Sequence, residues 1–273
     1  MSSRIGIGLL GLGTVGGGVA SILQSPDERH PLVADLKLIR VAVRDLNRTR
    51  SVELPKEILT TDPSDVVNDP AVDVVVELIG GIEPARSLIL QAIATGKSVV
   101  TANKAVIARH GEEIAAAAAK AGVYVLIEAA VGGGIPIIEP LKQSLGANRI
   151  NRVSGIINGT TNYILTRMAD EGAAYESVLK DAQELGYAEA DPAADVDGLD
   201  AADKIAILAN LAFGGSVERS AIPTAGISQL QGRDVDYAKQ LGYGVKLLAV
   251  AERMKQSGDP LPLSLRVQPT LVP

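Results

Sequence analysis

Residues 5–18 of the chain read IGIGLLGLGTVGGG, and this stretch decides the fold. Its first part belongs to an aliphatic run over residues 4–10 that is typical of a short buried strand. The residues that follow position 16 suggest a helix. Between the two lies the spacing G-x-G-x-x-G at Gly11, Gly13 and Gly16. In this context the spacing is typical of a strand-turn-helix unit that holds a phosphate.

Each glycine of this turn has a predicted role. Gly11 permits the tight turn, Gly13 lets the backbone approach a pyrophosphate, and Gly16 lets the helix pack closely on the strand. The phosphates would lie at the helix N-terminus, where free N–H groups favour an anion. Because 28 of the 273 residues are glycine, the spacing also arises by chance, and its place after a strand carries the prediction. We expect Gly11, Gly13, Thr14, Val15 and Gly16 to bind a dinucleotide cofactor.

A second predicted strand, over residues 38–43, ends in charged residues. An acidic residue at this tip binds the ribose hydroxyl of NAD, whereas a cation there accommodates the 2′-phosphate of NADP. The tip residue is Arg44, with Arg48 close by, so NADP is favoured. Asp45 is one position away and keeps NAD open, and a solvated charged turn without a cofactor role is the alternative.

Strands and helices alternate over the rest of the first half. The predicted strands cover residues 72–79, 97–101 and 123–127, and the predicted helices cover residues 85–94 and 105–120. This alternation predicts a doubly wound parallel α/β sheet of the Rossmann type. Such sheets bind ligands at the carboxyl ends of their strands, so we expect Gly80 and residues 101–104, including Lys104, at the cofactor site.

The second half predicts a different, α+β, domain. The expected elements are helices over 137–145, 175–185 and 199–213, a strand over 152–157, and a turn with a Thr or Asn N-cap over 158–162. The predicted organisation is therefore a cofactor-binding domain over residues 1–130 and a second domain over residues 131–273.

Composition excludes several classes of function. The chain has 26 Lys+Arg against 32 Asp+Glu, a net charge of −6, which argues against binding to nucleic acid or to an anionic membrane. It has no cysteine and two isolated histidines, His30 and His110, which excludes thiolate catalysis and a multi-histidine metal site. The sequence shows neither a signal peptide nor an apolar run long enough to span a membrane, so we expect a cytoplasmic protein.

Carboxylates are concentrated just before one lysine, over residues 189–204. Asp200 and Lys204 are four apart in the predicted helix 199–213, so they share one helical face. One interpretation is a surface ion pair, and the other is a lysine that donates a proton and is tuned by its carboxylate partner. The acidic positions lack the spacing of an EF-hand, and they suit the ammonium group of an amino-acid substrate. Leu199 and Ile205 are expected on the buried face of this helix.

Residues 128–136, EAAVGGGIP, are too rich in glycine for a regular element. Their carbonyl groups could line a small cation site beside Glu128, or the segment could be a crossover loop between the domains. The residues taken alone favour the loop.

Several blocks of this sequence together resemble the homoserine dehydrogenase family. They are GLGTVG over 11–16, TANKA over 101–105, EAAVGGGIP over 128–136, NGTTNY over 158–163 and LGYAEADP over 185–192, followed by Gly198, Leu199, Asp200 and Lys204. The first block is common to many dinucleotide-binding folds, whereas the order and content of the others are specific. The resemblance extends from Ile5 to about Val272.

This resemblance implies a reaction. The family reversibly reduces L-aspartate 4-semialdehyde to L-homoserine with NAD(P)H, in the biosynthesis of threonine, methionine and isoleucine. By resemblance, Lys204 gives a proton to the carbonyl oxygen, Asp200 is its carboxylate partner and contacts the substrate, and Lys104 is a second active-site lysine. Either lysine could be the final proton source. The local chemistry agrees, because hydride addition to an aldehyde builds an alkoxide that a cationic donor stabilises and protonates.

The resemblance also implies ligand contacts. Three residues would bind the substrate: Glu189, which holds its amino group, Gly159 and Thr160. Four would hold a sodium ion: Glu128, and through their main-chain carbonyls Val131, Gly133 and Ile135. This implication reverses the preference for a simple loop. A homodimer is expected, with residues 131–273 as the substrate-binding and dimerisation domain.

Two further expectations concern the end of the chain and the alternatives to this enzyme. Family members continue beyond position 273 through a segment that returns to the cofactor domain, and many add a regulatory domain, so we expect both to be absent here. Another dehydrogenase on the same plan often has a histidine near its lysine, and His30 and His110 lie elsewhere in the sequence. A non-catalytic NADP-binding sensor is the second alternative.

Overall fold

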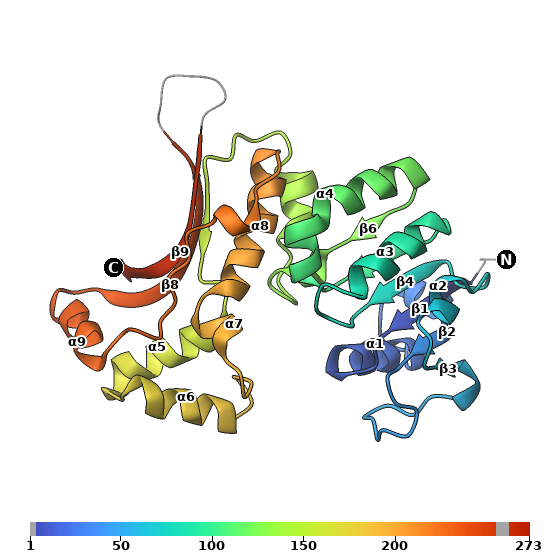
Figure 1. The fold of residues 1–273 in the computed structure, drawn as a ribbon, viewed down its shortest axis with the longest axis horizontal. Coiled ribbons are helices and arrows are strands. Elements are labelled where there is room, and N and C mark those ends of the chain that lie inside the picture. The colour runs from blue at the N-terminus through green and yellow to red at the C-terminus, as the bar shows by residue number, and fades with distance from the viewer. Residues whose placement is uncertain (1–3, 255–261) are drawn as a thin grey trace. The chain divides into compact units, whose positions relative to one another are not determined.

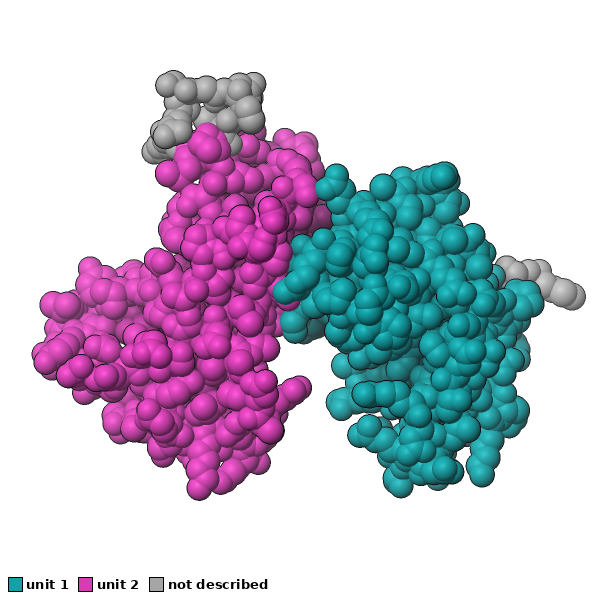
Figure 2. Space-filling view, in the orientation of Figure 1, with its two compact units in different colours: residues 1–136 teal, residues 137–273 magenta. Residues whose placement is uncertain are grey.

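The computed structural model describes residues 4–254 and 262–273. The chain divides into two compact units, residues 1–136 and residues 137–273, which Figure 2 colours separately. Each unit has a sheet of its own, and the elements of both are labelled in Figure 1. No helix within the described residues is both long and apolar enough to cross a membrane.

Unit 1 is built on a six-stranded parallel sheet in the order β3-β2-β1-β4-β5-β6. Its strands are β1 (Ile5–Leu10), β2 (Leu36–Ala42), β3 (Leu59–Thr60), β4 (Val74–Glu77), β5 (Ser98–Thr101) and β6 (Val125–Leu126). Its helices are α1 (Thr14–Gln24), α2 (Ser64–Val67), α3 (Ala85–Ala94) and α4 (Lys104–Ala121), with short 3-10 turns η1 (Pro31–Asp35), η2 (Lys56–Ile58) and η3 (Glu128–Ala130). The parallel pairing and the helices between successive strands confirm the predicted doubly wound sheet.

The two central strands of unit 1, β1 and β4, are mostly buried. Leu9 and Val41 have no exposed surface, and they pack with Ala20 of α1 in one core. Burial on both faces explains why β1 and β4 do not show the polar alternation of a half-buried strand. β4 is shorter than the predicted run 72–79 at both ends, and beyond its carboxyl end the N–H of Ile79 bonds to the side chain of Glu77 and not to a neighbouring strand.

The order of strands reverses beside β1. From β1 the chain runs outward to β2 and β3, and then crosses to β4 and runs outward in the other direction to β5 and β6. The carboxyl ends of β1 and β4 therefore form the switch point at which sheets of this kind bind ligands. Gly11 follows β1 there and Leu78 follows β4, and the N–H of Leu78 donates to the carbonyl of Leu10 at 2.8 Å.

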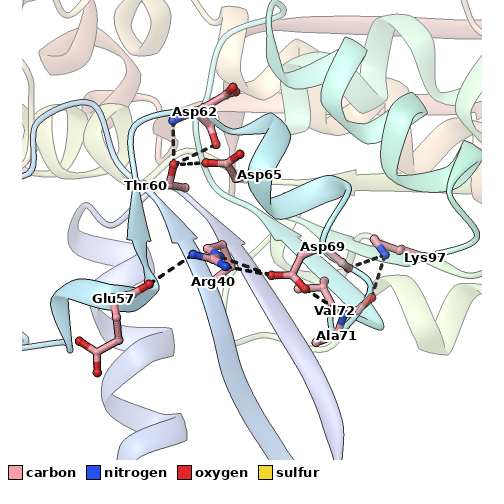
Figure 3. A network of polar contacts seen from close by, with 9 residues as sticks. All are labelled: Arg40, Glu57, Thr60, Asp62, Asp65, Asp69, Ala71, Val72 and Lys97. Carbon is pink, nitrogen blue, oxygen red and sulfur yellow. Dashed lines mark hydrogen bonds and ion pairs between the residues drawn. The ribbon is translucent and has the colours of Figure 1, made fainter.

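A polar network lies near the opposite, amino ends of β4 and β5 (Figure 3). Lys97 is only 7% exposed, and its Nζ donates to the carbonyls of Val72 at 2.9 Å and Asp69 at 3.0 Å. The Asp69 carboxylate accepts from Arg40 of β2 at 3.4 Å and from the N–H of Ala71 at 2.9 Å. The network ties the loop before β4 to β2 and to the start of β5, so its role is structural.

Replacing Lys97 with methionine is expected to lower the free energy of unfolding by about 1–3 kcal/mol, because two carbonyl groups would lose their donor inside the protein. Urea unfolding measures this change. The same replacement at Lys56, which is exposed, is the control and should change stability by less than about 0.5 kcal/mol. Equal free energies of unfolding in the two variants would contradict the stabilising role of Lys97.

Unit 2 contains a three-stranded antiparallel sheet in the order β7-β8-β9. Its strands are β7 (Arg152–Gly155), β8 (Gly244–Arg253) and β9 (Leu263–Val272). Its helices are α5 (Gly159–Glu171), α6 (Tyr175–Glu184), α7 (Ala193–Val196), α8 (Leu199–Phe213) and α9 (Gly232–Gln240), with a π-helical turn η4 (Pro140–Ser144) and a 3-10 turn η5 (Arg219–Ala221). These elements confirm the predicted α+β character of the second half.

Two predicted details of unit 2 differ in the structure. The segment predicted as a helix over 137–145 is helical over 138–144, but Pro140–Ser144 form a π-helical turn, in which the N–H of Leu145 donates to the carbonyl of Pro140 at 2.8 Å. The placement of Leu199 on a buried face is wrong: it is 46% exposed, since it is the first residue of α8. Ile205, one and a half turns later, is buried as predicted.

Candidate active site

The glycine turn after β1 shows why each glycine is needed. Gly11 has a left-handed φ of +101°, and a Cβ there would lie 2.8 Å from the carbonyl oxygen of Leu78. A Cβ on Gly16 would lie 2.2 Å from the carbonyl oxygen of Gly11, so α1 can approach the turn only with glycine at that position. Both distances are too short for real side chains. The fold of unit 1 itself therefore requires Gly11 and Gly16.

Gly13 differs from its two neighbours in the motif. Nothing lies within 4 Å of the position of a Cβ on Gly13, and its φ of −84° and ψ of −154° do not require glycine. It is the N-cap of α1, and no side chain caps the helix there, so the first N–H groups of α1, over Thr14 and Val15, are without intrahelical acceptors. Open space beside free N–H groups fits a pyrophosphate approaching the backbone.

The charged tip after β2 is exposed. Arg44 is exposed to solvent in this unit, and the packing of the fold does not require a charged side chain at this position. One carboxylate oxygen of Asp45 accepts from the N–H of Asn47 at 2.8 Å, and the carbonyl of Asp45 accepts from the Arg50 guanidinium. Asp45 is thus partly used in fixing its own turn, whereas Arg44 is accessible to a ligand.

The carboxyl edge of the sheet also positions Gly80 and Lys104. Gly80 is exposed, with a φ of +79°, three residues after the end of β4. Lys104 is the first residue of α4, directly after the N-cap Asn103, whose side chain accepts from the N–H of Val106. The structure therefore places Gly80 and Lys104 on segments that follow adjacent strands, β4 and β5, as predicted.

In unit 2, the predicted pair on α8 is formed. The Nζ of Lys204 lies 2.7 Å from Oδ2 of Asp200, and it also donates to the carbonyl of Ile157 at 2.9 Å. The side chain of Asp200 is 5% exposed and that of Lys204 is 17% exposed. This pair is therefore not the solvated surface ion pair that the sequence left open.

Asn158 joins this pair to two other segments. As N-cap of α5, its Oδ1 accepts from the N–H of Thr161 at 2.8 Å. Its Nδ2 donates to Asp200 at 2.9 Å and to Oδ1 of Asp195 at 2.7 Å. Asn158 and Asp195 were not among the predicted site residues. The N-cap pattern gave a signal for Asn158, but nothing in the sequence linked it to residues about forty positions later.

The predicted substrate residues lie on two segments that the structure ties together. The Thr160 hydroxyl donates to the carbonyl of Tyr187 at 2.8 Å, and the Tyr187 ring lies 4.9 Å from that of Tyr163. Gln183 donates to the carbonyl of Glu189 at 3.0 Å, so the loop that carries Glu189 is held at two points, Tyr187 and Glu189. Gly159 and Glu189 are both exposed, which leaves them accessible to a ligand.

Arg167 supports the same region of unit 2. Its guanidinium donates to the hydroxyl of Tyr163 at 2.8 Å and to Glu171 and Asp181. Its hydrogen bond holds the pKa of the Glu171 carboxyl below the usual range. Tyr163, whose ring contacts that of Tyr187, is thereby held by a network of charged side chains.

The segment that was predicted to hold sodium begins with η3 and continues in a tight turn. The N–H of Ile135 donates to the carbonyl of Gly132 at 2.6 Å, and Gly132 and Gly134 have φ of +63° and +84°. Val131 is buried, whereas Gly133 and Ile135 are exposed, and Glu128 is half-buried. Over residues 4–254 and 262–273, no cluster of three or more His, Asp or Glu side chains could hold a metal ion. A cation here would depend on carbonyl oxygens, which suit a hard cation.

Comparison with known families identifies the family to which this chain belongs. The family model of homoserine dehydrogenase matches residues 136–273, and that of the homoserine dehydrogenase NAD-binding domain matches residues 11–128. The chain belongs to the homoserine dehydrogenase family. The first match covers the part of the chain that contains Lys204 and its hydrogen-bond partners, and the second covers the part that contains the glycine turn.

Individual relatives agree with this assignment. A homoserine dehydrogenase of Synechocystis is 61% identical over 266 residues, which is 97% of this chain and 61% of that protein. One from Bacillus subtilis is 47% identical, over 98% of this chain and 61% of that protein. The chain thus spans about three fifths of the length of these homoserine dehydrogenases.

Solved structures of the family share this fold. A homoserine dehydrogenase from Thiobacillus denitrificans has a TM-score of 0.88 at 51% identity, and the match covers 98% of this chain and 62% of that one. A hyperthermophilic archaeal homoserine dehydrogenase, solved in complex with NADPH, has a TM-score of 0.78 at 25% identity, over 98% of this chain and 82% of that one.

Proposed function

We propose that this chain carries the catalytic machinery of a homoserine dehydrogenase, an oxidoreductase that reversibly reduces L-aspartate 4-semialdehyde to L-homoserine with NADPH in threonine, methionine and isoleucine biosynthesis. The observation that carries the proposal is the pair of buried Asp200 and partly buried Lys204, at 2.7 Å, in a member of this family. A buried ion pair contributes little to stability compared with apolar packing, so its presence favours a chemical role.

The residues of this chain divide the chemistry between them. When bound, the reduced nicotinamide supplies the hydride that adds to the aldehyde carbon. Lys204 stabilises the developing alkoxide with its ammonium group and gives it a proton. Asp200 and the carbonyl of Ile157 hold that ammonium group in one position. Lys104 is the alternative proton source.

Other residues would bind the ligands. Glu189 accepts hydrogen bonds from the substrate ammonium group, with Gly159 and Thr160 beside it at the start of α5. The N–H groups of the glycine turn and the start of α1 bind the cofactor pyrophosphate.

Arg44 would select the cofactor. Its replacement with alanine is expected to raise the Kd for NADPH by about ten- to a hundredfold, since a charge-assisted contact with the 2′-phosphate is lost. The Kd for NADH, which lacks that phosphate, should change by less than about threefold. Fluorescence titration of both cofactors measures the two constants. An equal change in both would contradict the assignment of Arg44 to the 2′-phosphate.

Two further properties are proposed with this function. Glu128 and the carbonyls of Val131, Gly133 and Ile135 would hold a sodium ion, and two copies of the chain would associate through unit 2 as a homodimer. Assays with sodium and then potassium as the sole alkali cation test the first, and molar mass from light scattering tests the second.

The direct test of the proposed activity is NADPH consumption by the purified chain with aspartate semialdehyde, and NADP reduction with homoserine. We expect both, with no turnover of sugars or of other amino alcohols. Turnover of a different hydroxyl compound would indicate another dehydrogenase on the same plan. Cofactor binding without turnover, in the chain and in a version extended to the length of its relatives, would indicate a sensor and reject the proposal.

A further inference from the structure

Glu77 is a carboxylate with no exposed surface at the carboxyl end of β4. Its Oε1 accepts from the N–H of Ile79 at 2.8 Å and lies 3.4 Å from that of Gly80, and its Oε2 accepts from the hydroxyl of Thr101 at 2.6 Å. Burying a carboxylate is costly unless donors compensate for the lost water. The donors come from two segments, the turn after β4 and the end of β5, so the carboxylate links them.

The link continues through Asn103. Thr101 Oγ1 accepts from the N–H of Asn103 at 2.9 Å, and Asn103 is only 7% exposed. The Nδ2 of Asn103 donates to the carbonyl of Gly81 at 2.8 Å, which returns to the turn after β4. Glu77, Thr101, Asn103 and this turn therefore form a closed ring of hydrogen bonds, which we call the edge ring.

The turn in the edge ring has little side-chain packing to define it. Gly80 and Gly81 have left-handed φ of +79° and +74°, and no atom lies closer than 4.0 Å to a Cβ built on either of them. The conformation of this turn is fixed by hydrogen bonds to Glu77 and Asn103 rather than by side-chain packing. Lys104 follows Asn103 directly, so the ring also sets where α4 begins.

We propose that Glu77, Thr101 and Asn103 are positioning residues, which act through the Gly80–Gly81 turn and the start of α4 to set cofactor affinity and the place of Lys104. This inference deepens the proposed function and rests on it for the roles of Gly80 and Lys104. The edge ring lies entirely within unit 1, and its effect is read most directly from cofactor binding.

The test compares Thr101→Val with Thr101→Ser. Valine keeps the shape of threonine but removes the hydroxyl, so Glu77 loses a donor and the N–H of Asn103 loses its acceptor; serine keeps the hydroxyl. We expect Thr101→Val to raise the Kd for NADPH, measured by fluorescence titration without substrate, by about tenfold, and the KM for NADPH to rise in parallel. Thr101→Ser should recover most of the affinity.

Thr95→Val is the matched control. The Thr95 hydroxyl also donates to carbonyls of unit 1, those of Val67 at 3.0 Å and Ala92 at 2.9 Å, but it follows α3, at the amino edge of the sheet. We expect it to lower the melting temperature as Thr101→Val does while leaving the Kd for NADPH within twofold of wild type. If Thr101→Val does not fold, Asn103→Ser, which keeps a helix cap but loses the donor to Gly81, replaces it with the same expectation.

A Kd for NADPH within twofold of wild type in the valine variant, or in Asn103→Ser, would overturn the inference. So would an equal weakening in Thr95→Val, because general destabilisation would then explain the loss. A wild-type chain that binds NADPH but does not reduce aspartate semialdehyde would contradict the proposed function alone, since binding still decides the role of the edge ring.

Discussion

Replacing Lys204 with methionine is expected to lower the turnover of aspartate semialdehyde by about a hundred- to ten-thousandfold. Methionine fills nearly the same space but carries no proton and no charge, so the alkoxide formed by hydride addition would lose its donor. Steady-state kinetics in both directions measure the effect. The loss should fall mainly on kcat, because the ammonium group interacts most strongly with the charge that develops in the transition state.

Stability must be separated from chemistry in this experiment. Removing Lys204 leaves the carboxylate of Asp200 buried without its ion-pair partner, which is expected to cost about 3–5 kcal/mol. Lys246→Met is the matched control: its Nζ is also partly buried in unit 2, where it donates to Asn162 at 3.0 Å and Thr166 at 2.9 Å. Turnover of Lys204→Met within tenfold of wild type would reject its role, and a larger loss in Lys104→Met would make that lysine the proton source.

Replacing three different glycines, in and just after the glycine turn, with alanine is expected to have three different effects. Gly16→Ala is expected to destabilise unit 1 strongly, because its Cβ would lie 2.2 Å from the carbonyl oxygen of Gly11. Gly13→Ala should leave stability nearly unchanged, since nothing of the protein lies within 4 Å, yet it should raise the Kd for NADPH by at least about a hundredfold by obstructing the pyrophosphate. Gly18→Ala, inside α1 with open space around it, should stabilise the protein by about 0.5–1 kcal/mol.

Thermal unfolding and fluorescence titration of the same three variants check this prediction. The informative result is that in Gly13→Ala the affinity for NADPH should fall while the thermal stability stays nearly unchanged. If Gly13→Ala binds NADPH as wild type does, the pyrophosphate does not lie against this turn.

The fold of unit 1 and the long helix α8 of unit 2 could be predicted because their signals are local. α3 covers residues Ala85–Ala94 and α8 covers Leu199–Phe213, the ranges predicted from periodicity and from flanking glycine and proline. In the second sheet, only β7 was predicted, as the strand over 152–157, whereas β8 and β9 were not. β8 pairs with β7 across about a hundred residues, and its sequence GVKLLAVAER lacks the strict alternation of a half-buried strand.

The contacts of the candidate site were predictable only where the residues lie close together in the sequence. Asp200 and Lys204 are four residues apart, so helical geometry alone brings them together. Asn158 and Asp195 reach the same cluster only through the packing of α5 and α7 beside α8, and Glu77 meets Thr101 only through strand register. Contacts of this kind depend on tertiary structure, which periodicity does not encode.

The carbonyl of Ile157 gives the Lys204 ammonium group a fixed orientation. Of its three N–H groups, one is directed at Asp200 and one at this carbonyl within the described residues, which leaves the third for an acceptor in a single remaining direction. Ile157 lies between β7 and α5, and in the proposed reaction the main chain there would fix the direction in which Lys204 presents its proton. A change in the backbone around residue 157 would thus alter the proposed proton transfer without altering any ionisable side chain.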